Sequence, residues 1–187
     1  MISITYEPGP TDNSNWLLKT SNGGGLIQGG YPNPSILNRG KHLTDLLIEA
    51  GVTIFISLLT EEDMANHNVH PYCNLVHDLK CYSLPIKDRD VICDKSLMDL
   101  VEFILFEMLR GNIIYLHCWG GHGRSGTVSI ALLMRLGLDL KSAVTSVNTA
   151  HSYRLVRNRV NFQGKGPQYN QVKRIQTTYI NLGYIKK

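Results

Sequence analysis

A cysteine, five intervening residues and an arginine form the part of this sequence best suited to chemistry. They lie in the segment HCWGGHGRSG, which runs from His117 to Gly126. As a thiolate, Cys118 could attack phosphorus, and the planar guanidinium of Arg124 could hold two phosphate oxygens at once. The loop glycines let successive backbone N–H groups turn inward toward an anion. The residue types and their spacing therefore predict a cradle in which sulfur attacks a phosphate ester.

The sequence on either side of this segment suits the same chemistry. An apolar run over 113–117 predicts a central strand before the cysteine, and the pattern over 127–136 predicts a helix after the arginine. A strand, a glycine-rich turn and a helix N-terminus together form an anion-binding site. The free N–H groups and the helix dipole favour the thiolate of Cys118 over the thiol, whose ordinary pKa is about 8.5.

The other side chains of the segment have subsidiary predicted roles. Ser125 could donate a hydrogen bond to Cys118 and ease its release from a phosphoenzyme. We expect His117 to order the loop through backbone hydrogen bonds and to help hold the thiolate charge. We expect Trp119 to pack the loop against the fold rather than to form a wall for an aromatic substrate. His122 could contact a second phosphate.

The segment resembles the signature of the protein tyrosine phosphatase superfamily. Its compact dual-specificity branch, which includes kinase-associated phosphatase and bacterial proteins with an HCWGG loop, looks most similar. Residues 84–88, LPIKD, resemble the general-acid segment of that group, and 166–168, GPQ, resemble the element that opens its last helix. Weaker landmarks at 29–32 and 50–53 extend the resemblance to about residues 25–182.

The resemblance implies a metal-independent hydrolase of phosphate monoesters that passes through a phosphocysteine intermediate. Cys118 would be the nucleophile and Arg124 the residue that binds the transferring phosphoryl group. Substrate contacts are implied for the loop residues Trp119, Gly120, Gly121, His122, Gly123 and Arg124, and for Gln168.

Asp88 is the predicted general acid. The leaving oxygen becomes an alkoxide or a phenolate, and a carboxylic acid held nearby can protonate it and later activate water. The alternative interpretation is a surface aspartate in the charged loop 87–90, where Asp90 lies two residues further on. The Pro-Ile-x-Asp match favours Asp88.

Gln168 is implied by the resemblance to position the hydrolytic water. A polar residue near a helix start is the equally weighted alternative. The second glutamine of the family would fall at Val172, whereas this chain has Gln171.

Length and composition favour one compact globular domain. The chain has 187 residues, 43% of them hydrophobic, and a formal net charge of +4, which suits anionic substrates without indicating nucleic acid. No apolar stretch is long enough to span a membrane, and no signal peptide is expected.

The four cysteines, 73, 81, 93 and 118, lack CxxC spacing, which argues against a zinc site and a disulfide scaffold. A catalytic thiol implies a reducing, cytoplasmic compartment, and no metal or cofactor is expected.

The pattern predicts a single phosphatase domain over 1–187, with residues 1–25 as an irregular lead-in. We expect a largely parallel sheet with helices on both faces. Strands are expected at 26–28, 53–59, 81–84 and 113–117, and helices at 34–50, 95–109, 127–136, 139–151 and 168–182.

Two other groups of residues receive ordinary structural interpretations. A solvated charged surface is favoured over a docking site for the basic residues Arg154, Arg157, Arg159 and Lys165. The histidines at 67, 70 and 77 lack the regular spacing of a zinc site.

The preferred substrate is a phosphorylated protein or peptide. No long recognition loop that would deepen the pocket is identifiable, so a shallow pocket for phosphoserine, phosphothreonine and phosphotyrosine is expected. RNA 5′-phosphates and phosphoinositides are alternatives, although the loop lacks the lysines typical of lipid-directed relatives. A phosphate-binding scaffold is the alternative from another class. The intact Cys118, Arg124 and Asp88 argue against it.

Overall fold

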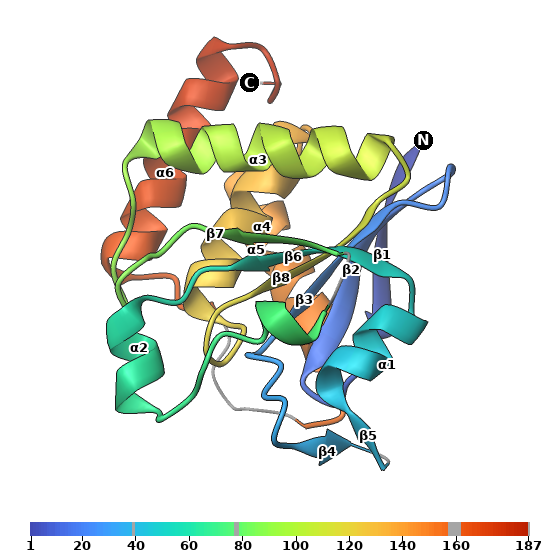
Figure 1. Ribbon diagram of the computed structural model, residues 1–187. Coiled ribbons are helices and arrows are strands. Elements are labelled where there is room, and N and C mark those ends of the chain that lie inside the picture. The colour runs from blue at the N-terminus through green and yellow to red at the C-terminus, as the bar shows by residue number, and fades with distance from the viewer. Residues whose placement is uncertain (39, 77–78, 157–161, 187) are drawn as a thin grey trace.

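The computed structural model describes residues 1–38, 40–76, 79–156 and 162–186. Within them, six strands form one mixed sheet in the order β1-β2-β3-β8-β6-β7 (Figure 1). The strands β3, β8, β6 and β7 run parallel, and β1 and β2 add an antiparallel edge. Their bounds are Ile2–Pro8 for β1, Ser14–Thr20 for β2, Gly25–Gly29 for β3, Val52–Ser57 for β6, Lys80–Ser83 for β7 and Ile113–His117 for β8.

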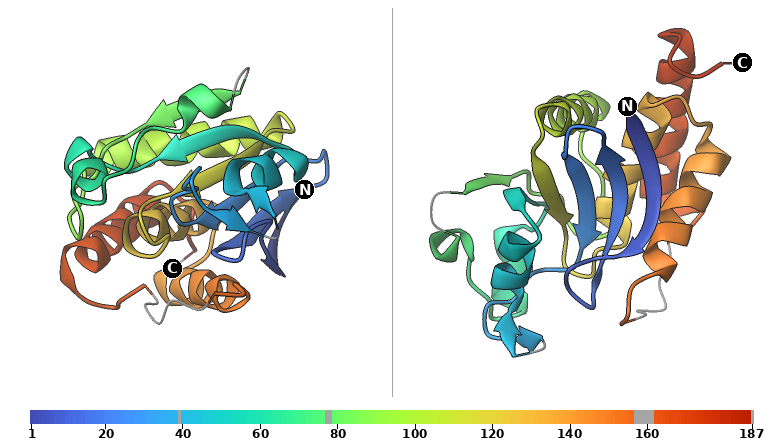
Figure 2. Two further views of the ribbon diagram at one scale, coloured as in Figure 1. Left: turned by 60° about the horizontal axis from the view of Figure 1, so that its bottom comes forward. Right: turned by 90° about the vertical axis from the view of Figure 1, so that its right-hand side faces the viewer.

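Helices lie on both faces of this sheet, as the two views of Figure 2 show. One face carries α3 (Asp94–Leu109), α4 (Gly123–Arg135), α5 (Leu140–Ser152) and α6 (Gly166–Asn181). The other face carries α1 (Leu43–Glu49) and the short 3₁₀ helix η1 (Cys73–Leu75), while α2 (Glu61–Asn66) follows β6. The predicted α/β class and the parallel centre of the sheet are confirmed.

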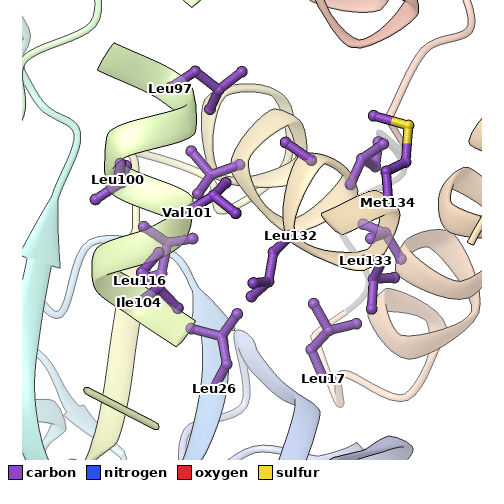
Figure 3. Packing of buried hydrophobic residues seen from close by; sticks show 14 of the residues in the cluster. Leu17, Leu26, Leu97, Leu100, Val101, Ile104, Leu116, Leu132, Leu133 and Met134 are labelled. Atoms are coloured by element: carbon purple, nitrogen blue, oxygen red, sulfur yellow. The ribbon is translucent and has the colours of Figure 1, made fainter. Parts of the chain in front are cut away.

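Alternation along the central strands produces two hydrophobic clusters, one on each face. Ile114 and Leu116 of β8 face the larger cluster with α3 and α4, whereas Tyr115 faces the smaller one with Leu47 of α1. Figure 3 shows the larger cluster, in which Leu132 of α4 lies among side chains from α3 and the sheet. Helix α4 is buried along most of its length, so the loop before it is anchored at both ends.

The predicted irregular lead-in over 1–25 is wrong. Two strands, β1 and β2, occupy most of it and pair with each other and with β3. Most of the Gly, Pro and Asn residues that suggested irregular structure lie in or beside the two connections at 9–13 and 21–24, and in the first of these Gly9 N–H bonds to Ser14 O at 2.9 Å. Leu17 and Leu18 of β2 are fully buried. The strand expected first, at 26–28, is therefore the third.

The helix expected at 34–50 is also wrong in its first half. Only Leu43–Glu49 is helical, and a small hairpin of β4 (Leu37–Asn38) and β5 (Lys41–His42) precedes it. Gly40 has φ of 79°, a left-handed conformation that favours glycine and suits this turn. The apolar residues that suggested a helical stripe, Ile36 and Leu37, are exposed. The remaining predicted elements agree with the structure to within a few residues.

Candidate active site

The loop 118–122 lies between the carboxyl end of β8 and the first turn of α4. Cys118 is buried, with 3% of its surface exposed, and its Sγ lies 3.5 Å from Ser125 Oγ. Gly121 has φ of 74°, and a Cβ there would lie 2.4 Å from the backbone of Gly29. This glycine is therefore required both for the turn of the loop and for its close approach to β3.

A pocket of about 740 Å³ opens over this loop. It brings together three segments that the sequence analysis treated separately: the loop itself, the segment with Asp88 and the start of α6 with Gln168. The sequence-predicted residues that line it are Asp88, Cys118, Trp119, Gly120, His122, Gly123, Arg124, Lys165 and Gln168.

The guanidinium of Arg124 is held by a carboxylate that the sequence analysis did not identify. Arg124 is 2% exposed, and its Nη1 and Nη2 donate to Asp63 Oδ2 and Oδ1 at 2.6 and 3.3 Å. Nη1 also donates to Ile86 O at 2.9 Å. Burial acts to raise the pKa of Asp63, but hydrogen bonds from Arg124 and Thr60 outweigh it, so the pKa is lowered. Asp63 is therefore a stable counterion for the arginine.

The sequence around Asp63 contains a helix-capping pattern that could have placed this residue at the start of a helix. Thr60 caps α2, and Thr60 and Asp63 form a capping box in which each side chain accepts from the other's backbone N–H. The pattern Thr-x-x-acid after a buried strand predicts such a helix start. Since β6 and β8 are parallel neighbours, a helix that follows β6 begins near the loop that follows β8.

Asp88 lies at the pocket, and Asp90 does not line it. The Oδ1 of Asp88 is 3.3 Å from Nη2 of Arg124, while 62% of the Asp88 side chain is exposed. Asp90 is instead used locally, because its Oδ1 accepts from Val91 N–H at 2.8 Å. Of the two carboxylates, only Asp88 lines the pocket that Cys118 also lines.

His117 is a buried, neutral scaffold residue. Tyr72 contributes its hydroxyl to His117 Nε2 at 2.6 Å, and His117 Nδ1 lies 3.3 Å from Cys118 O. Burial lowers the pKa of His117 to about 4. The imidazole is therefore uncharged at neutral pH, and it can act on Cys118 through hydrogen bonding rather than through a positive charge.

Trp119 packs between two rings at the edge of the pocket. It stacks on Tyr31 with centroids 5.6 Å apart and on His67 with centroids 3.6 Å apart. Both His67 and Trp119 line the pocket. This tryptophan thus anchors the loop to the fold and also presents an edge to the cavity.

His122 lines the pocket with a ring that carries no charge. Burial lowers its pKa to about 4, with a smaller contribution from the nearby Arg154. Its Nδ1 is buried without a hydrogen-bond partner among the described residues.

The two glutamines at the start of α6 differ in position. Gln168 lines the pocket, and its Nε2 donates to Asp90 O at 3.4 Å. Gln171 is buried and donates to Ile92 O at 2.6 Å and to Asp94 Oδ1 at 3.0 Å. Only Gln168 is placed to contact a substrate or a water in the pocket.

The expectation of a solvated surface at Arg154 is wrong. This side chain is 2% exposed and lies beneath the loop, where it donates to Gly121 O at 3.0 Å. Gln28 of β3 binds the same carbonyl through Nε2 at 2.8 Å. The basic residues 157 and 159 lie outside the described residues, whereas Lys165 is exposed and lines the pocket.

The remaining cysteines and histidines form no metal site among the residues described. Cys73 lies beside Cys81, Cys93 caps α3, and all three are free thiols. Of the histidines considered above, residue 77 lies outside the described part of the chain. No helix in the described ranges is long and apolar enough to cross a membrane.

The α/β sheet and the anion cradle at the end of β8 define the class as that of the dual-specificity-like phosphatases, which act on phosphate monoesters. The chain belongs to the family described as PTP-SAK, Swiss Army Knife protein, DSP-PTPase phosphatase domain, whose model matches residues 35–168.

A viral relative supports this assignment. The chain is 35% identical over 133 residues to "Putative tyrosine phosphatase 067L" of Invertebrate iridescent virus 3. The match covers 68% of this chain and 50% of the viral protein, so the chain spans about half the length of this curated relative.

Solved structures show the same fold at low sequence identity. Kinase associated phosphatase, with its catalytic cysteine replaced by serine, matches with a TM-score of 0.71 and 18% identity over 94% of this chain and 98% of its own. PTPMT1 in complex with PI(5)P matches with a TM-score of 0.63 and 17% identity over 84% and 94%. Human DUSP28 matches with a TM-score of 0.62 and 18% identity over 84% and 94%.

Proposed function

We propose that this protein dephosphorylates phosphotyrosine and phosphoserine or phosphothreonine in proteins through a phosphocysteine intermediate. One observation carries the proposal: Cys118, Arg124 and Asp88 line a single pocket, and Asp63 holds the arginine in place. A thiol, a bidentate phosphate ligand and a carboxylic acid are the groups that this chemistry requires. A pure phosphate-binding scaffold has no use for the nucleophile or the acid.

The hydrogen bonds of Arg124 indicate how a phosphate would enter. Asp63 occupies the Nη1–Nη2 edge of the guanidinium, and Asp88 touches Nη2 at 3.3 Å. Nε makes no hydrogen bond to a described residue, so the Nε–Nη2 edge can receive two phosphate oxygens once Asp88 moves aside. Phosphate binding would thereby release Asp88 from the arginine at the moment when it is needed beside the leaving oxygen.

The proposed reaction has two balanced steps. First, the Cys118 thiolate forms an Sγ–P bond as the P–O bond to the leaving group breaks, and Asp88 gives its proton to the leaving oxygen. Second, water attacks phosphorus, Asp88 takes a proton from that water, and the Sγ–P bond breaks. Ser125, 3.5 Å from Sγ, is placed to donate a hydrogen bond to the departing thiolate. Gln168, at the pocket, is proposed to position the water.

The lining of the pocket supports a protein substrate. His67, Trp119 and Lys165 line the same pocket as Cys118. These side chains would contact the peptide on either side of a phosphorylated residue. We place the activity in a reducing, cytoplasmic compartment, because Cys118 must remain a free thiol.

A parallel turnover assay tests this proposal. Matched phosphotyrosine, phosphoserine and phosphothreonine peptides are compared with a phosphoinositide panel and a 5′-triphosphorylated RNA, all in the presence of chelator. We expect peptide hydrolysis that vanadate inhibits. Faster turnover of the lipid or of the RNA would overturn the substrate assignment, and a requirement for added zinc or magnesium would overturn the mechanism.

A further inference from the structure

A second arginine lies buried directly beneath the phosphate cradle. Arg154 follows the C-terminal end of α5 and is 2% exposed. All five N–H groups of its guanidinium donate hydrogen bonds to neutral oxygens. Nε donates to Asn15 Oδ1 at 2.7 Å, Nη2 to Gly121 O and Gln28 O at 3.0 and 3.3 Å, and Nη1 to Gly120 O and Asn13 Oδ1 at 3.3 and 3.4 Å.

Two of these oxygens belong to the catalytic loop itself. Because Gly120 O and Gly121 O point down toward Arg154, the peptide groups that carry them are fixed in orientation. The N–H of a peptide unit points away from its own carbonyl. The arginine thus directs loop N–H groups toward the opposite side, where the phosphate would lie.

The charge of Arg154 is not balanced in the way that the charge of Arg124 is. Arg124 lies within ion-pair distance of two carboxylates, Asp63 and Asp88. In the described part of the chain, no carboxylate forms an ion pair with Arg154. Burial lowers the pKa of Arg154 to about 10, while Tyr115 and Cys118 act in the opposite direction. The side chain therefore remains protonated at neutral pH, as a buried cation close to the nucleophile.

We infer that Arg154 is a positioning residue that aligns the cradle and supplies the unbalanced positive charge favouring a thiolate at Cys118 and a phosphate above it. The inference rests on the proposed function. The two arginines would have different roles. Arg124, whose charge is largely neutralised by carboxylates, would bind two phosphate oxygens, and Arg154 would supply the net positive charge from beneath the loop. In the low dielectric of a buried site such a charge acts strongly on a neighbouring anion.

The test compares Arg154→Lys, which keeps the charge, with Arg154→Gln, which keeps a hydrogen-bond donor and loses the charge. Arg174→Gln is the matched control, because Arg174 is half-exposed and pairs with Asp94 on the outer face of α6. The readouts are the alkylation rate of Cys118 by iodoacetamide below neutral pH and the affinity for vanadate. Neither needs a substrate, so both remain informative if the proposed hydrolysis fails.

The other charged or titratable groups near Cys118 stay unchanged in all three variants. They are His117 and Tyr115 of β8, Tyr72 beside η1, Asp63 of α2, Asp88, and His122 and Arg124 at the start of α4. A change in alkylation between Arg154→Lys and Arg154→Gln therefore reports on the charge at position 154.

We expect Arg154→Gln to slow alkylation by about tenfold and to weaken vanadate binding by a similar factor, with Arg154→Lys and Arg174→Gln close to wild type in alkylation. Arg154→Lys should still lower kcat with little change in KM, since the ammonium loses the fork that orients two carbonyls. Circular dichroism and thermal melting identify any variant that does not fold. Equal alkylation in folded Arg154→Gln and wild type would overturn the inference. Should Arg154→Gln not fold, unequal alkylation of Arg154→Lys and wild type would overturn it.

Discussion

The catalytic loop and the residues that support it differ in how the chain encodes them. The loop is one contiguous segment, 117–126, that holds the sulfur, the guanidinium and the turn glycines. Its supports come from distant parts of the chain: Gln28 of β3, Asp63 of α2, Tyr72 beside η1 and Arg154 after α5. In the proposed mechanism the loop supplies the reactive groups, whereas the supports set their charge balance and orientation.

The difference between the loop and its supports matters most for the net charge around Cys118. The loop on its own contains one arginine and one nucleophile, so its sequence suggests that Arg124 is the positive charge of the site. The structure places Asp63 against the guanidinium of Arg124, and we infer that Arg154, beneath the loop, supplies the net positive charge. The same ten-residue segment placed on other supports would therefore have a different electrostatic field.

The largest expected effect comes from the loop. Replacing Cys118 by Ser should abolish hydrolysis of a generic aryl phosphate while vanadate or phosphate still binds, because the cradle persists without its nucleophile. Steady-state assays and calorimetry measure the two properties. Cys93→Ser is the matched control, since this exposed thiol caps α3 away from the pocket. Equal turnover by wild type and Cys118→Ser would refute the sulfur mechanism.

The second largest effect should show which of two neighbouring carboxylates, Asp88 or Asp90, is the general acid. Asp88→Ala should lower kcat by about 10²-fold or more on phosphoserine or phosphotyrosine peptides, and much less on an activated aryl phosphate that departs without a proton. The basic limb of its pH–rate profile should flatten. Asp90→Ala should show neither change, because Asp90 bonds to its own loop. The reverse pattern would move the general acid by two residues.

The third largest effect should come from replacing Asp63, which supports Arg124 from outside the loop. Asp63→Asn removes the charge opposite Arg124 but keeps the shape, so we expect a loss of stability of about 3 kcal/mol and a roughly tenfold loss of kcat/KM. Chemical denaturation and aryl phosphate kinetics measure these losses. Asp45→Asn on the exposed side of α1 is the control. If Asp63→Asn behaved like that control, the account of Arg124 as an arginine held by its carboxylate would be untenable.

Sequence reasoning succeeded where the information is local. The strand–loop–helix unit around Cys118 and the long helix α3 follow from short-range patterns, and the structure has them nearly as expected. It failed where pairing is long-range. Arg154 looked like part of a basic surface stretch, and nothing near it in sequence indicates that Asn15, 139 residues away, accepts its Nε–H. In the same way, β1 and β2 are strands because they pair with each other and with β3.

The smallest expected effect is on the pH dependence of stability. The pKa of His117 is lowered to about 4 in the folded protein from an ordinary value of 6.5. Between these values the unfolded chain binds the proton and the folded protein does not, so stability should fall as the pH drops from about 6.5 toward 4. Above pH 7 this residue should contribute no pH dependence.

Urea denaturation across that range measures the effect. His117→Asn should show a flatter dependence than wild type, with His70→Asn, an exposed histidine, as the control. His122 has a similarly lowered pKa, so part of the dependence should remain in His117→Asn. An unchanged slope in His117→Asn would mean that its imidazole is not kept neutral by burial.

The central claim, that phosphorus is transferred to sulfur in this cradle, is tested most directly by trapping the intermediate. Asp88→Ala is mixed with an activated aryl phosphate, because loss of the carboxylate should slow the attack of water more than the departure of a good leaving group. The reaction is quenched rapidly, and the digested protein is mapped by mass spectrometry. The account predicts one added phosphoryl group on the peptide that contains Cys118, absent from the double variant with Cys118→Ser. A phosphoryl group on another residue, or turnover with no trapped intermediate at any quench time, would contradict it.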